Sequence, residues 1–293
     1  MKLSEKFKLL LRLPFTWIQR ICYPTPKIMS DMQTLKYIYE NKCSIARFGD
    51  GELDLMYNIG IKFQKADRKL SKRLREIACY KDYSKALICI PDIFLSKKQL
   101  HDKFAADDAK WYCKNLLATR GLWHKSFRNS FYGDANLSRF YVERNDKNRV
   151  PAYVNELKKL WEGRDIVFVE GEKSRLGMGN DLFDNAKSIK RILCPSRNAF
   201  DKYDAILSTV LSYTTNEDLI ICALGPTATV LSYDLSQNDR TALDLGHVDI
   251  EYEWFLLGTT RKEGIKGKDV NEVNDAFNED CAKVPTNVIA EIY

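Results

Sequence analysis

Residues 43–54 read CSIARFGDGELD, a short apolar run followed by a turn with two acidic residues. The run has the length and composition of a buried strand, and Gly49 and Gly51 allow the chain to turn sharply behind it. Asp50 and Glu52 would then both point outward from the strand end. They are either ordinary turn residues, since aspartate and glycine are favoured in turns, or carboxylates placed to hold a charged ligand.

Four further apolar runs repeat this pattern. They are KALICIP (85–91), DIVFVEG (165–171), SIKRILCP (188–195) and LIICALG (219–225). Amphipathic stretches lie between them, near residues 68–80, 104–118, 151–161, 200–214 and 226–236. Buried strands that alternate with helices predict an α/β fold: a Rossmann-like, mostly parallel sheet with helices on both faces. Because no repeat or low-complexity linker follows, residues 31–293 are expected to form a single domain behind an N-terminal segment, residues 1–30.

The overall composition fits a folded cytoplasmic protein. Of the 293 residues, 45% are apolar, enough for a core, and 12% are aromatic, which argues against disorder. The formal net charge of +6 suits an anionic ligand or a membrane surface but is too small to indicate nucleic-acid binding. The eight cysteines form no CxxC pair, and no secretory signal is recognised at the start of the chain, so reduced thiols are expected.

Residues 1–22 alternate basic and large apolar side chains. This composition is typical of an amphipathic segment that lies on an anionic membrane, with Pro14 bending it. The segment therefore predicts peripheral contact with the inner face of the membrane. The alternative is a helix that packs its apolar residues on the domain. No apolar stretch in the chain reaches the length needed to span a bilayer.

The two acids of the first turn are also the first candidates for chemistry. The carboxylates of Asp50 and Glu52 suit a hard divalent ion such as Mg²⁺ or Mn²⁺, which keeps further coordination sites for phosphate oxygens and water. Arg47, just before the turn, would balance that charge, hold a phosphate, or pair with a surface acid. On spacing alone an ordinary turn remains the alternative.

In parallel sheets ligands bind beyond the carboxyl ends of the strands, so the loops after the later runs are candidates too. The loop GEKSRLGMGND, residues 171–181, combines glycines that permit close backbone approach with donors for an anion. Its candidate binding residues are Gly171, Lys173, Ser174, Arg175 and Asn180. After the last run, Gly225, Pro226 and Thr227 would begin a helix whose N-terminal amides form an anion site. Loops of both kinds also occur without any ligand, and that alternative stays open.

The stretch LGHVDIEYEWFLLG, residues 245–258, concentrates ionisable residues. In a helix or in a strand, Asp249 and Glu253 share one face, while Ile250 and Trp254 would pack inward. Together with His247, the two acids suit a metal, a sugar hydroxyl or proton transfer, and these three are the candidate catalytic residues. The alternative is a capped surface helix with a structural histidine.

Five blocks, taken in chain order, resemble the GT-D-type glycosyltransferases, a family first catalogued as a domain of unknown function and found in bacterial glycan-assembly loci. The blocks are SIARFGDGELDLM, VFVEGEKSRLGMGNDLF, SIKRILCPSRNAFDKYDAIL, ALGPTATVLSYDL and DLGHVDIEYEWFLLG, within about residues 40–260. The resemblance implies a Rossmann-like glycosyltransferase that uses a nucleotide sugar, typically UDP-glucose, and a divalent metal. Residues 1–30 and the tail after about 262 lie outside it, and the divergent segment 126–146 leaves the acceptor unassigned.

The resemblance also implies roles for the candidate residues. The metal motif of the family, Asp-x-Glu, falls on Asp50 and Glu52, so Mn²⁺ or Mg²⁺ held there would bridge the donor diphosphate. Arg47 and the loops at 171–181 and 225–227 would bind the donor, while Asp249 or Glu253 would orient an acceptor hydroxyl. The acceptor would be a lipid-linked or protein-linked glycan in cell-surface polysaccharide or glycoprotein assembly. Two other classes stay open: a metal-dependent phosphoesterase, and a non-catalytic subunit that binds a nucleotide sugar.

Overall fold

The computed structural model describes residues 14, 18, 21–23, 25–270, 273 and 285–293. The segment predicted to contact a membrane, residues 1–22, falls outside the described residues except at positions 14, 18, 21 and 22. Peripheral membrane contact through this segment therefore stays a prediction. Among the described helices, none combines the length and the apolar character needed to cross a bilayer.

The described residues form a parallel sheet of nine strands in the order β1-β4-β3-β2-β8-β7-β5-β6-β9. The strands are β1 (Lys27–Ile28), β2 (Ser44–Arg47), β3 (Ala86–Ile90), β4 (Phe131–Asp134), β5 (Asp165–Gly171), β6 (Ser188–Cys194), β7 (Leu219–Ala223), β8 (Thr241–Asp244) and β9 (Val288–Glu291). All five residues of β3 are buried, as expected for a strand covered on both faces.

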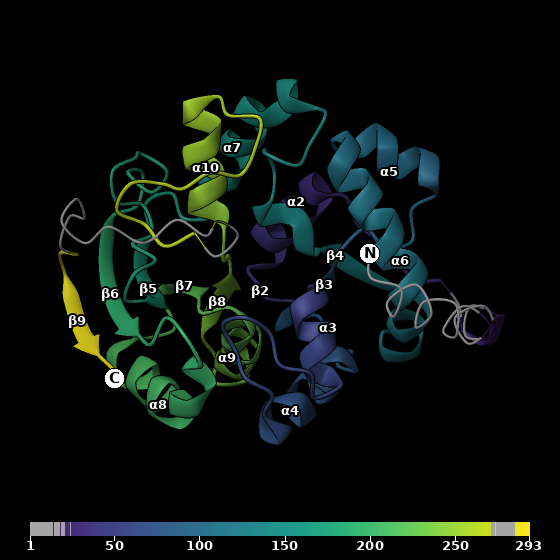
Figure 1. Cartoon of the computed structure of the whole chain (residues 1–293). Helices are drawn as coiled ribbons and strands as arrows, with labels where there is room; N and C mark the ends of the chain where they lie inside the picture. The colour runs from purple at the N-terminus through teal and green to yellow at the C-terminus, as the bar shows by residue number, and fades with distance from the viewer. Residues whose placement is uncertain (1–13, 15–17, 19–20, 24, 271–272, 274–284) are drawn as a thin grey trace.

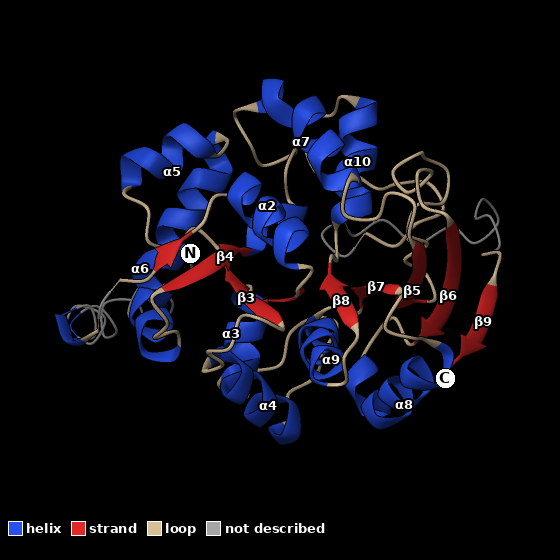
Figure 2. Ribbon diagram, turned by 180° about the vertical axis from the view of Figure 1, so that it is seen from behind, coloured by secondary structure: helices blue, strands red, loops and turns tan. Residues whose placement is uncertain are grey.

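Helices cover both faces of the sheet. They are α2 (Asp31–Asn41), α3 (Asp50–Met56), α4 (Arg68–Ala78), α5 (Lys97–Lys103), α6 (Ala106–Ser126), α7 (Val150–Lys158), α8 (Tyr203–Tyr213), α9 (Pro226–Gln237) and α10 (Val248–Leu257), with short 3-10 helices η1 (Ala135–Ser138), η2 (Lys147–Arg149) and η3 (Ala199–Lys202). Helices α3, α4, α8 and α9 lie on one side, and α2, α7 and α10 on the other (Figures 1 and 2). The predicted α/β fold, a parallel sheet covered on both faces, is confirmed.

Two local expectations are corrected or resolved by the structure. The GDGELD segment is the first turn of α3 rather than a free turn: Gly49 is its N-cap, and Glu52 at the third helical position accepts a hydrogen bond from the Gly49 amide. The sequence left the stretch 245–258 undecided between helix and strand, and in the structure it contains helix α10.

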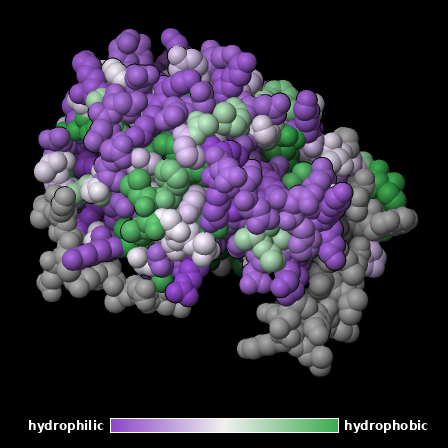
Figure 3. All heavy atoms as spheres, turned by 90° about the horizontal axis from the view of Figure 1, so that it is seen from above, coloured by the Kyte–Doolittle hydropathy of each residue, from purple (hydrophilic) through white to green (hydrophobic). Residues whose placement is uncertain are grey.

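The face of the molecule seen from above is mainly hydrophilic, with small apolar patches between polar residues (Figure 3).

Candidate functional site

A cleft of about 720 Å³ opens at the carboxyl ends of the central strands. It is lined by segments that follow β2, β3, β4, β5, β7 and β8. Strands β2 and β8 are neighbours at its centre, although one belongs to the first part of the chain and the other to the last. After β2 the chain continues into α3 on one face of the sheet, and after β8 it continues into α10 on the other face, so the segments that follow these neighbouring strands diverge (Figure 1). Ligands of parallel sheets bind at such points, and the cleft lies at the strand ends, where the sequence predicted a ligand site.

Asp50 and Glu52 lie in the first turn of α3 and both line the cleft. Asp50 is exposed and has neither a hydrogen bond nor an ion pair with another residue in the described part of the chain. Glu52 is half-buried, and its Oε2 accepts a hydrogen bond of 2.7 Å from the Gly49 amide. Burial raises the pKa of Glu52 to about 7, and the nearby Asp244 and Asp50 carboxylates add to the rise. The cleft therefore presents closely spaced carboxyl groups without a cation between them.

Arg47 supports the floor of the cleft. Its five guanidinium N–H donors go to protein acceptors: the Asp244 carbonyl (2.5 Å) and Oδ1 (3.0 Å), the Gly246 carbonyl (3.1 Å), the Ala135 carbonyl (3.0 Å) and Ser138 Oγ (2.5 Å). The other oxygen of Asp244 accepts bonds from the Arg47 amide at 3.2 Å and the Thr229 hydroxyl at 3.3 Å. Arg47 thus ties β2, β8 and η1 together, with its donors already used.

The N-terminus of α9 forms another part of the wall. Gly225, its N-cap, lines the cleft with φ of +54°, and a Cβ there would lie 2.8 Å from the Phe63 ring. This residue must therefore be glycine both for its backbone angle and for the close approach of Phe63. Pro226 occupies the first helical position, as predicted. Thr227 is fully buried, and its hydroxyl has no hydrogen-bond partner among the described residues.

The glycine-rich loop after β5 contributes fewer cleft residues than its sequence suggested. Ser174 lines the cleft, and a Cβ on Gly171 would lie 3.2 Å from the Ser174 hydroxyl. Arg175 donates to the Gly267 carbonyl at 3.2 Å. Lys173 is joined through its carbonyl to the Asp269 amide at 3.0 Å, so the C-terminal tail packs along this loop. Residues 180–187 form turns and bends, so no helix follows directly after Asn180.

The two acids of α10 share a face, as predicted, but both are bound to the protein. Lys268 contacts Asp249 Oδ2 at 2.6 Å and Glu253 Oε1 at 2.7 Å. The Asn180 amide donates to Asp249 Oδ1 at 2.8 Å and to Glu253 Oε1 at 2.7 Å, and the Gly177 amide reaches Asp249 Oδ1 at 3.0 Å. Burial raises the pKa of Asp249, while Lys268 acts against it. This pair holds the glycine-rich loop and the tail onto α10, and Asp249 also borders the cleft.

His247, the third candidate catalytic residue, is half-buried in the cleft wall at the start of α10. It has φ of +73°, a left-handed conformation that is strained for histidine. Its Nε2 lies 3.3 Å from the Arg139 guanidinium. Arg139 in turn lies 3.7 Å from Glu143, whose carboxylate contacts Lys262 at 2.5 Å. The histidine is therefore adjacent to a chain of alternating charges along this wall.

Several cleft residues were not predicted from the sequence. Helix α6 contributes Asp107, Asp108, Trp111, Tyr112 and Asn115, whose spacing of one, three and four residues places them on one helical face. This spacing was a usable signal, but the stretch was interpreted only as a packing helix. The tail contributes Lys262, Asp269 and Val270, from a region taken to lie outside the family resemblance.

The donor set fits a divalent ion that is only partly bound by protein. Among the described residues, no three His, Cys, Asp or Glu side chains are close enough to hold an ion by themselves. Mg²⁺ commonly uses one or two carboxylates and takes its other ligands from substrate phosphates and water. Asp50 has no partner in the described chain, and Glu52 sits beside it among further negative charge. These two oxygen donors, facing an open cleft, suit Mg²⁺ or Mn²⁺ together with a phosphate ligand.

Residues 45–273 of the chain match the family described as the glycosyltransferase GT-D fold. This match extends beyond residue 260, so the tail that carries Lys262 and Lys268 is part of the family region. The chain is 41% identical over 253 residues, 86% of its length, to the probable glycosyl transferase Gly of Streptococcus gordonii. It is 37% identical over 248 residues, 85% of its length, to the glycosyltransferase GlyD of Streptococcus pneumoniae serotype 4. The chain spans about a third of these curated relatives, 36% and 30% of their lengths.

Solved structures described as glycosyltransferases are also similar to this chain. One is described as a new glycosyltransferase (DUF1792) from Streptococcus sanguinis, with TM-score 0.85 and 38% identity, covering 92% of this chain and 100% of that chain. Another is described as the highly conserved domain of unknown function 1792 with a distinct glycosyltransferase fold, with TM-score 0.85 and 36% identity, covering 95% and 98%.

Proposed function

The chain belongs to the GT-D glycosyltransferase family, and on this premise we propose that it transfers a hexose, glucose in the first instance, from a UDP-sugar to a glycan acceptor in a metal-dependent reaction. The product would be part of a bacterial cell-surface polysaccharide or glycoprotein. The single observation that carries the proposal is the open carboxylate pair, Asp50 and Glu52, in the cleft at the β2–β8 junction. A divalent ion held by one or two carboxylates commonly takes its remaining ligands from water and substrate phosphates, and a nucleoside diphosphate supplies the phosphates.

We assign the metal to Asp50 and Glu52. When bound, Mg²⁺ or Mn²⁺ would neutralise the charge that develops on the departing nucleoside diphosphate. Arg47 keeps Asp244 and the loop after β8 in place beneath these carboxylates, so its proposed role in donor binding is indirect. Gly225 lets a ligand approach the N-terminus of α9, where the backbone amides and the helix dipole favour negative charge.

The residues of α10 have two different positions with respect to the cleft. Asp249 and Glu253 are held by Lys268 and Asn180, which favours a positioning role: they would fix the loop that carries Ser174. His247 lines the cleft beside Arg139 and is the candidate that would contact the acceptor hydroxyl and accept its proton.

The test is a screen of UDP-, GDP-, CDP- and dTDP-sugars for slow hydrolysis by the full chain, with Mg²⁺ or Mn²⁺ and then with EDTA. We expect release of the nucleoside diphosphate from a UDP-sugar with metal and none with EDTA. Release of free phosphate or a sugar monophosphate instead would identify a metal-dependent phosphoesterase. Binding of the donor without any turnover would identify a non-catalytic nucleotide-sugar-binding subunit. Either result would contradict the proposed function.

A further inference from the structure

One end of the cleft is formed by a helix face that does not belong to the core. Helix α6 presents Asp107, Asp108, Trp111 and Asn115 to the cleft. Trp111 is 48% exposed, whereas Trp123, Trp161 and Trp254 are at most 1% exposed. A large aromatic ring left half open in a concave site provides apolar contact area that the fold itself does not use. The ring of Trp111 is therefore available to a ligand.

A buried amide faces the same end of the cleft. Asn136 lines the cleft and is only 5% exposed. Its Oδ1 accepts a hydrogen bond of 3.4 Å from the Tyr112 hydroxyl, but its Nδ2 has no partner among the described residues. An unpaired buried N–H₂ group is unfavourable unless a ligand supplies an acceptor. A ligand hydroxyl or ether oxygen would satisfy it.

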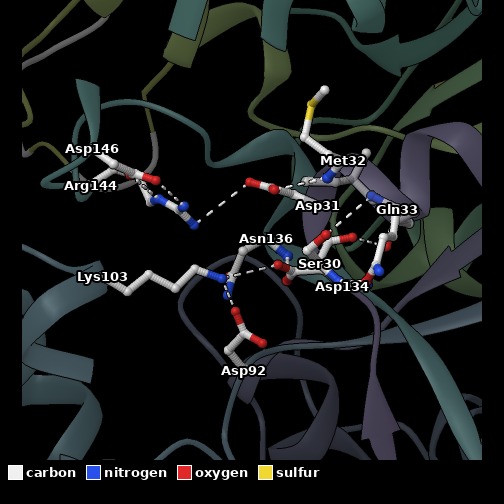
Figure 4. A network of polar contacts seen from close by, with 12 residues as sticks. Ser30, Asp31, Met32, Gln33, Asp92, Lys103, Asp134, Asn136, Arg144 and Asp146 are labelled. Carbon is white, nitrogen blue, oxygen red and sulfur yellow. Dashed lines mark hydrogen bonds and ion pairs between the residues drawn. The ribbon is translucent and has the colours of Figure 1, made fainter. Parts of the chain in front are cut away.

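The position of Asn136 is fixed by a buried ion network. Asp134 Oδ1 accepts a hydrogen bond of 2.8 Å from the backbone N–H of Asn136, Asp134 contacts Lys103 at 3.3 Å, and Lys103 is also paired with Asp92 (Figure 4). Asp134 is fully buried, so the network cannot easily rearrange. The backbone that carries Asn136 is thus held in place in η1, directly after β4, and the Tyr112 hydroxyl contacts its side chain.

The charges around this end are largely balanced. Glu143 is paired with Lys262 at 2.5 Å and lies 3.7 Å from Arg139. Asp107 is paired with Lys110 at 3.0 Å. Burial raises the pKa of Asp108, and the neighbouring Glu143 adds to the rise. Without a free cluster of positive charge, this end of the cleft suits an uncharged ligand with hydroxyl groups rather than an anionic one.

The same end adjoins the proposed metal carboxylates. Burial raises the pKa of Tyr112 well above its usual value, and the carboxylates of Glu143 and Asp50 both contribute. Asp50 and Tyr112 line the same cleft. A ligand on Trp111 would lie next to the donor site.

We propose that Asp108, Trp111 and Asn136 form an acceptor subsite that binds an uncharged pyranose ring, the terminal sugar of the acceptor glycan. The apolar face of the ring would stack on the Trp111 indole, and its hydroxyls would bond to Asn136 Nδ2 and the Asp108 carboxylate. This inference rests on the proposed function, because it takes the other half of the cleft to hold the sugar donor.

The first test measures binding without turnover. The full chain is labelled with 5-fluorotryptophan, and the ¹⁹F resonance of Trp111 is assigned as the one absent from Trp111→Phe. Methyl glucoside, methyl galactoside, methyl N-acetylglucosaminide and methyl glucuronide are titrated in with UDP and Mg²⁺ present. At least one of the three uncharged glycosides should shift the Trp111 resonance, and methyl glucuronide should shift it less. No shift with any uncharged glycoside, or the largest shift with glucuronide, would overturn the subsite.

The second test measures transfer from a UDP-sugar to the glycoside that binds best. Trp111→Ala should raise the KM for the glycoside about tenfold, with a smaller change in the KM for the donor, and Trp111→Phe should restore part of the loss. Asn136→Asp keeps the acceptor for Tyr112 but removes the unpaired donor, and it should raise the same KM. Tyr213→Ala, an exposed aromatic residue on α8, is the control and should change neither value. An unchanged glycoside KM in Trp111→Ala would reject the subsite.

The two proposals fail in different ways. If donor hydrolysis is absent but uncharged glycosides still shift the Trp111 resonance, the proposed function is wrong and the sugar subsite stands. If donor hydrolysis is present but no uncharged glycoside moves that resonance, the subsite alone is wrong.

Discussion

Two pairs of carboxylates lie at or next to the cleft, which Asp50, Glu52 and Asp249 line, and the pairs differ in what surrounds them. Asp50 and Glu52 stand in the first turn of α3, where the protein satisfies one Glu52 oxygen with the Gly49 amide and gives Asp50 no partner within the described residues. Asp249 and Glu253 stand on α10, where Lys268 and Asn180 contact both. One pair of acids is therefore left without a cation, whereas the other pair is neutralised within the protein. The difference is Lys268, which the C-terminal tail supplies.

The difference between the two carboxylate pairs follows from their burial. A carboxylate buried like Asp249, 1% exposed, is tolerated only if a paired charge and hydrogen bonds replace its water. Lys268 meets that requirement within the protein. Asp50 is exposed to the cleft, so water can solvate it, and it needs no internal partner. We expect the first pair to govern activity and the second pair to govern stability.

The largest effect should come from breaking the Lys268 contacts. Lys268→Met leaves the buried Asp249 carboxylate without its cation, which should lower the free energy of unfolding by about 3–5 kcal/mol. Urea unfolding at pH 7 measures this. The matched control is Lys266→Met, an exposed lysine two residues earlier, which should change stability by no more than about 0.5 kcal/mol. Equal losses in both variants would remove the distinction between the two carboxylate pairs.

The next effect should appear in activity. Asp50→Asn and Glu52→Gln should each lower metal-dependent hydrolysis of the donor about 10²–10³-fold, by analogy with the loss of a group that stabilises developing charge. Glu52→Gln retains an oxygen for the Gly49 amide, so the cap of α3 and the unfolding midpoint should be preserved. Steady-state kinetics and thermal melts of the same preparations test both statements. Full activity in either variant would show that the pair does not serve the reaction.

A third prediction concerns pH and a residue between the two acids of α10. Glu251 is buried, and its Oε2 accepts bonds from the Tyr141 and Val142 amides at 2.9 and 3.0 Å. Burial raises the pKa of Glu251 from its usual 4.5 to about 7. Because the folded state holds the proton more tightly than the unfolded state, this residue lowers stability as pH rises from about 4.5 to about 7.

The slope from this single group would be at most about 1.4 kcal/mol per pH unit. Glu251→Gln should flatten the decline, since the amide oxygen can still accept from Tyr141 and Val142 but does not titrate. Urea unfolding of both proteins at pH 5, 6 and 7 gives the comparison. Parallel stability curves would mean that Glu251 has an ordinary pKa in the folded protein.

The smallest expected effect comes from two glycine variants. Their comparison distinguishes the cost of backbone strain from an effect on the shape of the cleft. Gly258 has φ of +65° and ψ of +19°, a left-handed conformation in which alanine should cost about 1 kcal/mol in stability, whereas Gly225 has φ of +54° and ψ of −139°, a region almost restricted to glycine, in which alanine should cost about 1–3 kcal/mol. Only at Gly225 would the new Cβ meet the Phe63 ring, whereas at Gly258 nothing lies within 4 Å. We expect Gly225→Ala to weaken UDP binding and Gly258→Ala to leave it unchanged. Similar UDP affinities in both variants would show that the contact with Phe63 does not shape the donor site.

The sequence predicted the framework well because buried parallel strands are continuous apolar runs. The five predicted runs match β2, β3, β5, β6 and β7 to within two residues at either end. Strands β1, β4, β8 and β9 were missed: β1 has only two residues, and FYGD in β4, TALD in β8 and VIAE in β9 have four residues each, with polar residues among them. Their strand character comes from pairing with neighbours far along the chain, as in the pairing of Ile45 with Leu243.

For the site, the sequence indicated the loops at the strand ends because parallel topology alone brings them together. It could not indicate which carboxylates are paired. Lys268 lies 19 residues beyond Asp249 and 15 beyond Glu253, and its approach depends on how the tail packs against the glycine-rich loop. The cleft-facing side of α6 was also missed, because a helical pattern does not show whether a tryptophan contacts the core or lines a cleft.

The most direct test of the account is calorimetric titration of UDP, with and without Mg²⁺, into the wild-type chain and the Asp50→Asn, Glu52→Gln double variant. The account predicts that Mg²⁺ tightens UDP binding at least about tenfold in the wild type, through a metal held by these two carboxylates, and that the ion has no such effect in the double variant. Equal tightening by Mg²⁺ in both proteins, or no effect of Mg²⁺ on the wild type, would contradict it.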